Sequence, residues 1–320
     1  MKMTEFNFSS IFAEELRIYI NEKMAAGFKA QSFIFLARVF DRFCNNQGLK
    51  EKIFTVREAN EWLKKGDSEH QTSFYSRINF SKNFLRYLSL KGYDVYVVRD
   101  VRFIPSNFKP HIYTKEETER YFKAVDNYSD LNRKNAIQYP VLFRILYCCG
   151  TRISETLSIR KKDIDLDKGI IYLNETKNSK QRYVVVGDDL LMLLNRYADK
   201  CFYLLNDEDY IFSNIRGGKL TADHVYEHHR LFLKQAGIPY VGNNYGPRLH
   251  DWRHHMAVYA FKQLSDSGMD MYVALPILST YLGHKTIYAT EKYVRLTIEL
   301  FPQLEEKFKC KVEDIFGGMK

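Results

Sequence analysis

The first hundred residues carry hydrophobic side chains at three- to five-residue steps, which is the period of helices with one buried face. Gly48 and Gly92 follow two of these segments, and glycine commonly ends a helix. Thr55-x-x-Glu58 is a capping-box pattern that predicts the start of another helix. The apolar positions of the four segments are Ile11, Phe12, Leu16, Tyr19 and Met24; Phe33, Ala37, Phe40 and Cys44; Trp62 and Leu63; and Tyr75, Ile78, Leu85 and Leu88. Four short helices predict a small helical domain over residues 1–104.

The stretch that follows has no helical period and holds Pro105 and Pro110. We expect residues 105–113 to be a linker. Thr114-x-x-Glu117 is a second capping-box pattern. It predicts the first helix of a second domain, residues 114–320.

The second domain is helical apart from one β-hairpin. Gly169–Leu173 and Arg182–Val186 are rich in β-branched and aromatic residues, and they flank a polar segment, 174–181. Helical patterns return near residues 188–205, 221–236, 251–266, 274–282 and 286–300. The fold class predicted for the whole chain is mainly α with a small β-hairpin or sheet.

The C-terminal segment predicts one more helix, residues 303–316, after Pro302. Its apolar positions recur at three- to four-residue steps: Leu304, Phe308, Val312, Ile315 and Phe316. A short helix gains little stability alone, so this stripe needs a surface to dock on. Docking on its own domain and docking on a neighbouring copy of the chain are both open. We expect the second, and with it self-association.

Charge and cysteine content narrow the class of protein. The 320 residues carry a net charge of +9 with a pI near 9.1, which favours a polyanionic partner such as nucleic acid. Residues 1–104 hold 17 Lys/Arg against 12 Asp/Glu, a net +5, and the remaining residues hold 31 against 27, a net +4, so both parts could face DNA. Five cysteines without a CxxC pair disfavour a disulfide framework and a zinc site. No signal core or membrane-length apolar run is present, and we expect a cytoplasmic protein.

Five places in the second domain carry candidate chemistry: Arg152 with Glu155; Lys177 and Lys180 in the hairpin tip; His250 and Arg253; His284 after Gly283; and Tyr293. Each has an ordinary alternative, such as a salt-bridged arginine, a solvated turn or a hydrogen-bonded histidine. His250 and Arg253 are three residues apart, which predicts a shared helix face. His250, His254 and His255 also suggest a metal, but no HExxH spacing supports one.

Taken together, these residue types suit phosphoryl transfer to a protein nucleophile. Arginines neutralise the non-bridging oxygens of a phosphodiester. A histidine accepts a proton, and a lysine donates one to the leaving oxygen. A tyrosine hydroxyl forms a covalent phosphate ester.

The chain resembles the tyrosine recombinase, or phage integrase, family. The matching text is GTRISETLSI, TKNSKQRYVVV, LHDWRHH and LGHKTIYATEKY. The order of an arginine, a hairpin lysine, His-x-x-Arg, Gly-His and a tyrosine nine residues later is the pattern of that family. Trp252 stands where the family usually has leucine. The N-terminal helices resemble the family's core-binding, SAM-like DNA-binding domain in pattern only.

The resemblance implies a set of phosphate ligands. Arg152 and Arg253 would clamp the scissile phosphate, and His284 would donate a hydrogen bond to it. Glu155 would orient Arg152. Neither a metal ion nor a nucleotide cofactor is implied, because these cations carry the charge.

It also implies the proton transfers and the nucleophile. His250 would be the general base or proton shuttle, and Lys177 the general acid, with Lys180 as its competitor. Tyr293 would attack, leaving a 3′-phosphotyrosine and a free 5′-hydroxyl. The enzyme would act as a tetramer on core recombination sites in double-stranded DNA. Two alternatives are a type IB topoisomerase-like enzyme, which relaxes DNA without strand exchange, and a non-enzymatic DNA-binding relative.

Overall fold

The structure is a computed structural model, and it divides the chain into two compact units, Met1–Phe108 and Lys109–Lys320. The residues that it describes are 6–28, 30–102, 109–129, 133–174, 181–240, 242, 246–284, 286 and 288–302. The hairpin tip with Lys177 and Lys180, and the C-terminal segment 303–316, lie outside these ranges. No helix within the described ranges is long and apolar enough to cross a bilayer.

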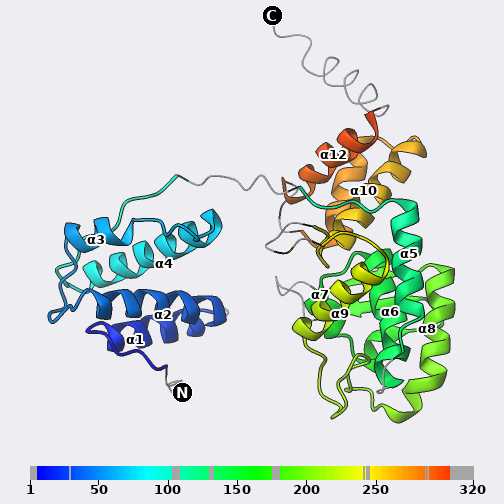
Figure 1. Cartoon of the computed structure of the whole chain (residues 1–320), viewed down its shortest axis with the longest axis horizontal. Helices are drawn as coiled ribbons and strands as arrows, with labels where there is room; N and C mark the ends of the chain where they lie inside the picture. The colour runs from blue at the N-terminus through cyan, green and yellow to red at the C-terminus, as the bar shows by residue number, and fades with distance from the viewer. Residues whose placement is uncertain are drawn as a thin grey trace, which may run out of the picture. The chain divides into compact units, whose positions relative to one another are not determined.

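The first unit is built from four helices: α1 (Ala13–Ala25), α2 (Ala30–Asn46), α3 (Val56–Trp62) and α4 (Gln71–Leu90) (Figure 1). Its core is aromatic, and Phe12, Phe40 and Phe84 are fully buried within it. The capping box predicted at Thr55 is confirmed, since the Thr55 hydroxyl accepts from the backbone of α3 and Glu58 accepts from the Thr55 backbone N–H.

The second unit holds the remaining helices: α5 (Lys115–Asp126), α6 (Arg133–Cys149), α7 (Ile153–Leu157), α8 (Asp188–Cys201), α9 (Ala222–Gln235), α10 (Asp251–Asp266), α11 (Met271–Leu282) and α12 (Tyr288–Leu300). Two short 3₁₀ turns, η1 (Lys161–Asp163) and η2 (Phe202–Leu204), complete the described helical elements. The predicted capping box of Thr114 and Glu117 opens α5 and is confirmed.

A three-stranded antiparallel sheet interrupts these helices, in the order β1 (Ile164–Asp165), β2 (Ile170–Leu173) and β3 (Arg182–Val185). The predicted hairpin is β2–β3, in which Ile171 pairs with Val184 on the buried face. β1 is a two-residue addition that the sequence did not predict, because so short a strand has no period. The predicted fold class, mainly α with a small sheet, is confirmed.

Helix α10 packs against α6, α11 and α12, and it lies next to α12 in the upper part of the second unit in Figure 1. Trp252 in its first turn is fully buried and stacks on Tyr113, with ring centroids 3.7 Å apart. This stacking fixes the start of α10 against the segment that precedes α5. The next residue, Arg253, therefore starts from a fixed backbone position, and its side chain reaches the C-terminal ends of α6 and α11.

Candidate active site

Arg152 stands at the N-terminus of α7 and is tied to a buried carboxylate. Glu155 accepts hydrogen bonds from the Arg152 backbone N–H at 2.8 Å and from its Nη1 at 2.7 Å. The Arg152 side chain remains 18% exposed, whereas that of Glu155 is 1% exposed. Glu155 thus anchors Arg152 without covering its guanidinium.

Glu155 binds a second arginine as well. Arg182, the first residue of β3, donates from Nη1 and Nη2 to the two carboxylate oxygens at 3.0 and 2.8 Å. Burial by itself would raise the pKa of Glu155, but the hydrogen bonds and charge of Arg182, with those of Arg152, lower that pKa to about 2. Glu155 is therefore ionised at neutral pH and links the start of α7 to the hairpin.

Arg253 is 1% exposed and is held by backbone carbonyls. Its Nη1 donates to the carbonyl of Gly150, just after α6, at 2.6 Å, and its Nη2 donates to the carbonyl of Leu282 at the end of α11. Terminal carbonyls of a helix lack partners within the helix, so the guanidinium satisfies them. Burial lowers the Arg253 pKa to about 10, which leaves the group charged at neutral pH.

Two glycines with left-handed backbone conformations lie beside these arginines. Gly150 has φ +57°, and a Cβ there would lie 2.2 Å from the Met256 methyl carbon. Gly283 has φ +65°, and a Cβ there would lie 2.9 Å from Nη1 of Arg182. Both positions have a left-handed backbone, which strains any residue with a Cβ, so glycine is favoured at each.

His284 follows Gly283 and bridges two elements. Its Nε2 lies 3.2 Å from Nη2 of Arg253, and its Nδ1 lies 2.7 Å from the hydroxyl of Thr290 in α12. Burial, and then the charges of Arg253 and Arg152, lower the His284 pKa to about 3. The imidazole is therefore neutral at physiological pH.

Tyr293 lies on α12 with its side chain 1% exposed, in a small apolar cluster with residues of α10 and α11. Its ring is nearly parallel to that of His284, with centroids 5.9 Å apart. The His254 ring lies 5.4 Å away on another side. Burial raises the Tyr293 pKa, although the charges of Arg253 and Arg152 oppose this rise. The phenol is therefore protonated at neutral pH.

His250 caps the start of α10 and is exposed, whereas Arg253 is buried, so the predicted shared face holds only in part. Partial desolvation of the imidazole ring, and then the charges of Arg253 and Lys292, lower the His250 pKa to about 4. The His254 ring stands edge-on to His250 at 5.0 Å. A neutral His250 at the edge of the site can accept a proton.

The three histidines of the metal alternative do not converge. His254 faces Tyr293, while the next residue, His255, packs on Tyr259 with ring centroids 4.5 Å apart. Within the part of the chain that the structure describes, no group of three or more His, Cys, Asp or Glu side chains could hold a metal ion.

The structure thus gathers Arg152, Arg253, His284 and Tyr293, with His250 at the edge. Sequence reasoning missed three neighbours of this group: Arg182, Thr290 and Lys292. The Lys292 ammonium lies 5.1 Å from the centre of the Tyr293 ring, and burial, with the charges of Arg253 and Arg248, lowers its pKa. Position next to the candidate tyrosine was the one signal for Lys292. Arg182 and Thr290 had no local signal.

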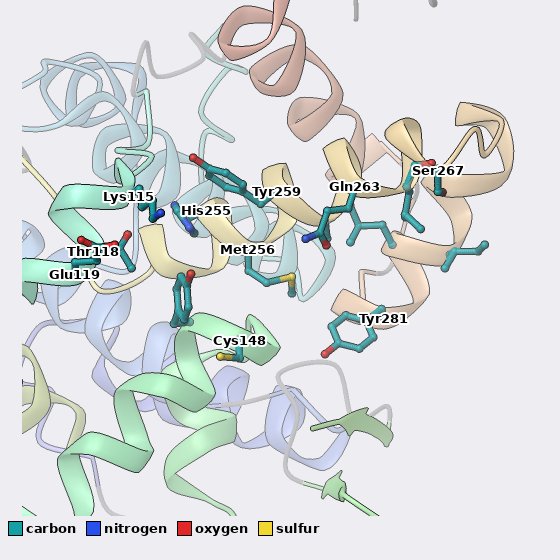
Figure 2. Close-up of a pocket in the computed structure, with 15 residues that line it drawn as sticks. Lys115, Thr118, Glu119, Cys148, His255, Met256, Tyr259, Gln263, Ser267 and Tyr281 are labelled. Carbon is teal, nitrogen blue, oxygen red and sulfur yellow. The ribbon is translucent and has the colours of Figure 1, made fainter. Parts of the chain in front are cut away.

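An apolar groove lies elsewhere on the second unit, with a volume of about 970 Å³ (Figure 2). Residues of α5, α6, α10 and α11 form its walls. Figure 2 labels Met256 of α10 and Tyr281 of α11 among the side chains that line the groove. Ile277 lines it and is 48% exposed. Lys115 and Glu119 of α5 add charges of both signs.

Comparisons with known proteins identify a family and several relatives that this chain resembles. A family model described as "Phage integrase family" matches residues 112–299. The tyrosine recombinase XerC of Staphylococcus saprophyticus is 25% identical over 267 residues, which cover 81% of this chain and 83% of that one.

Two solved structures share the fold. One is the XerH site-specific recombinase bound to palindromic difH substrate, a post-cleavage complex, with TM-score 0.64 and 16% identity over 96% of this chain and 93% of that one. The other is a lambda integrase tetramer bound to a Holliday junction, with TM-score 0.63 and 18% identity over 90% of this chain and 78% of that one.

Proposed function

This chain belongs to the phage integrase family, and from that membership we propose that it is a site-specific DNA recombinase that breaks and rejoins DNA through a covalent bond to Tyr293. The observation that carries the proposal is the arrangement around Arg253. Its buried guanidinium contacts His284, and the His284 ring lies parallel to that of Tyr293. The proposed phosphate ligand, Arg253, and the candidate nucleophile, Tyr293, therefore both lie next to His284.

The chemistry follows from the positions of these groups. Arg152 and Arg253 bind the non-bridging oxygens of the scissile phosphate, and His284 donates a hydrogen bond to it. The Tyr293 hydroxyl attacks phosphorus while its proton passes to His250. The bond from phosphorus to the 5′-oxygen breaks, and that oxygen takes a proton from Lys177. The products are a 3′-phosphotyrosine and a 5′-hydroxyl.

Rejoining reverses these steps with the 5′-hydroxyl of another strand. The phosphotyrosine bond keeps the free energy of the broken phosphodiester, so no nucleotide is consumed. Tyr293 is buried and protonated in the free protein. Attack on DNA therefore requires α12 to shift, and this gives assembly a means to control cleavage.

We expect the first unit to be a DNA-binding domain. Helix α4 has no acidic residue, and it exposes a polar stripe at helical spacing: Thr72, Ser76, Asn79, Asn83 and Arg86. Such side chains hydrogen-bond phosphates and base edges. Replacing Asn79 and Asn83 by alanine should weaken binding to the recombination site, while cleavage of DNA that is already bound continues.

The groove on the second unit suits the C-terminal stripe of a neighbouring copy. Its apolar lining and its Lys115 and Glu119 match a segment that alternates Leu304 and Phe308 with charged residues. We propose that residues 303–316 dock there in trans, in a cyclic tetramer on two DNA sites.

Two changes test this docking. A chain ending after Gln303 should fold and bind one site but lose paired-site assembly and strand exchange. Ile277→Glu, in the groove, should do the same, whereas Val273→Glu should not, because Val273 is 53% exposed on the same helix but outside the groove. Recombination by the truncated chain would rule out the trans contact, and its failure to fold would place the contact within one copy.

The covalent step is tested with Tyr293→Phe on a nicked suicide substrate. Wild type should form a protein–DNA adduct that resists denaturation, and the variant should bind equally but form none. An adduct in the variant would show that another residue attacks. Exchange between two sites, measured beside relaxation of a one-site supercoiled plasmid, separates recombination from topoisomerase-like activity.

A further inference from the structure

Thr290 is fully buried in the first turn of α12, three residues before Tyr293, and its hydroxyl lies 2.7 Å from Nδ1 of His284. The other ring nitrogen of His284 lies 3.2 Å from Nη2 of Arg253. The histidine is thus held on both sides, by the phosphate-binding arginine and by the helix that carries the nucleophile.

Hydrogen-bonding capacity decides which nitrogen of His284 carries the proton. A guanidinium has donors only, so Nε2 must accept the bond from Arg253. The ring is neutral, because burial and the charge of Arg253 lower its pKa to about 3. The single ring proton therefore sits on Nδ1, which donates it to the Thr290 hydroxyl.

In this tautomer, Nε2 of His284 cannot donate a hydrogen bond to the phosphate. Donation to a phosphate oxygen from Nε2 needs the proton on Nε2, and Nδ1 must then accept a bond. A hydroxyl meets both requirements, since it can accept from Nδ1–H or donate to a bare Nδ1. A carboxylate would hold the first tautomer, and an apolar side chain would leave Nδ1 buried and unpaired.

We propose that Thr290 is a positioning residue that supports His284 in both tautomers, so that Nε2 accepts from Arg253 in the free protein and donates to the phosphate once Arg253 has turned to the DNA. This inference rests on the proposed function. In the change, Nε2 takes a proton from water and Nδ1 releases one to water, so the net charge stays the same. The Thr290 contact also keeps the His284 ring beside Tyr293 throughout.

Helix α12 provides a matched control. Thr297 is also fully buried, but its hydroxyl donates to the Tyr293 carbonyl within the same helix, at 2.7 Å. Thr297→Val thus removes a buried threonine hydroxyl from the same helix without touching His284. Any general cost of such a substitution to α12 appears in both variants.

Single-turnover adduct formation on a nicked suicide substrate gives the first test. Thr290→Val should slow it by about 10- to 100-fold at unchanged DNA affinity, because small displacements of reacting groups have effects of this size. Thr290→Ser should restore the rate, and Thr297→Val should stay near wild type. In a protein that already carries His284→Ala, Thr290→Val should add nothing. Full additivity, or equal losses for Thr290→Val and Thr297→Val, would overturn the proposal.

Nitrogen-15 spectra of His284 give a test that does not depend on cleavage. The free protein should show the proton on Nδ1, and the Tyr293→Phe protein bound to its DNA site should show it on Nε2. A proton on Nε2 in the free protein, or no change on DNA, refutes the proposal. If wild type forms no adduct, the proposed function fails, and the spectrum of the free protein still decides the tautomer.

Discussion

Arg253 and Tyr293 are each 1% exposed, but their surroundings differ. Arg253 is fixed by the carbonyls of Gly150 and Leu282, so its position is set by hydrogen bonds at helix ends. Tyr293 is surrounded by apolar side chains and by the rings of His254 and His284. The proposed phosphate ligand is thus held by backbone hydrogen bonds, whereas the proposed nucleophile is buried mainly among apolar and aromatic side chains.

Because of this difference, the two groups of residues should affect the stability of the fold and the rate of the reaction to different extents. The arginines and Glu155 satisfy buried polar groups, so their removal should weaken the fold as well as the reaction. The Tyr293 hydroxyl takes part in one side-chain interaction, a hydrogen bond with Arg253. Its removal should therefore cost much less stability than removal of an arginine and should act mainly on the reaction. The proposed phosphate ligands are therefore already gathered in the free protein, whereas the proposed attack by Tyr293 requires a change in α12.

The largest effect should come from Arg253→Ala. Loss of a charge at the phosphate should slow adduct formation by about 10³-fold. The two buried carbonyls lose their partner, so the free energy of unfolding should also fall by about 3 kcal/mol. Urea unfolding beside Tyr293→Phe measures the contrast. Equal stability of the two variants would contradict this difference between the two groups of residues.

Lys177→Ala extends the comparison to the leaving group and should slow cleavage by about 10²-fold. A substrate with a 5′-bridging sulfur should recover most of the rate, since a thiolate leaves without a proton donor. Lys180→Ala is the matched control from the same hairpin tip. Rescue of Lys180→Ala instead would make Lys180 the general acid.

Glu155→Gln should have a smaller effect on cleavage, about 10-fold, because Arg152 keeps its charge and loses only its anchor. Its effect on stability depends on pH. The folded pKa of Glu155 is lowered from 4.5 to about 2, so its contribution is complete above about pH 5 and is lost as pH falls toward 2.

The shift corresponds to about 3 kcal/mol at pH 7 and about 1 kcal/mol at pH 3. The difference in unfolding free energy between wild type and Glu155→Gln should shrink accordingly when urea unfolding is repeated at the two pH values. A difference that stays constant with pH would mean that Glu155 is not the ionised anchor of both arginines.

Local patterns account for what the sequence predicted well. The capping boxes of Thr55 and Thr114 and the β2–β3 hairpin depend on neighbouring residues, and all three are confirmed. The order and spacing of the motifs identified Arg152, Arg253, His284 and Tyr293 as candidate site residues. The structure brings these four side chains together, and their catalytic roles stay predictions.

Other features depend on residues far apart in the chain. Arg182 reaches Glu155 across 27 positions, and no local pattern signals that pairing. The burial of Tyr293 depends on the packing of α12 against α10, which helical period alone does not fix. His250 and Arg253 differ in exposure because His250 precedes the first turn of α10 and Arg253 lies within it.

Metal removal should have the smallest effect of all. Arg152 and Arg253 supply positive charge at the proposed phosphate site, and the Lys292 ammonium lies 5.1 Å from the centre of the Tyr293 ring. In the proposed reaction, these fixed charges take the role that metal ions have in other phosphoryl-transfer sites. Adduct formation in excess EDTA should therefore stay within about 2-fold of the untreated rate. The control is Arg253→Ala, whose lost activity added magnesium should not restore, because the carbonyls that held the guanidinium offer a hard cation too few ligands. Loss of wild-type cleavage in EDTA, with recovery on adding zinc or magnesium, would mean that the arginines are insufficient and that the histidines of α10 bind a metal when DNA is present.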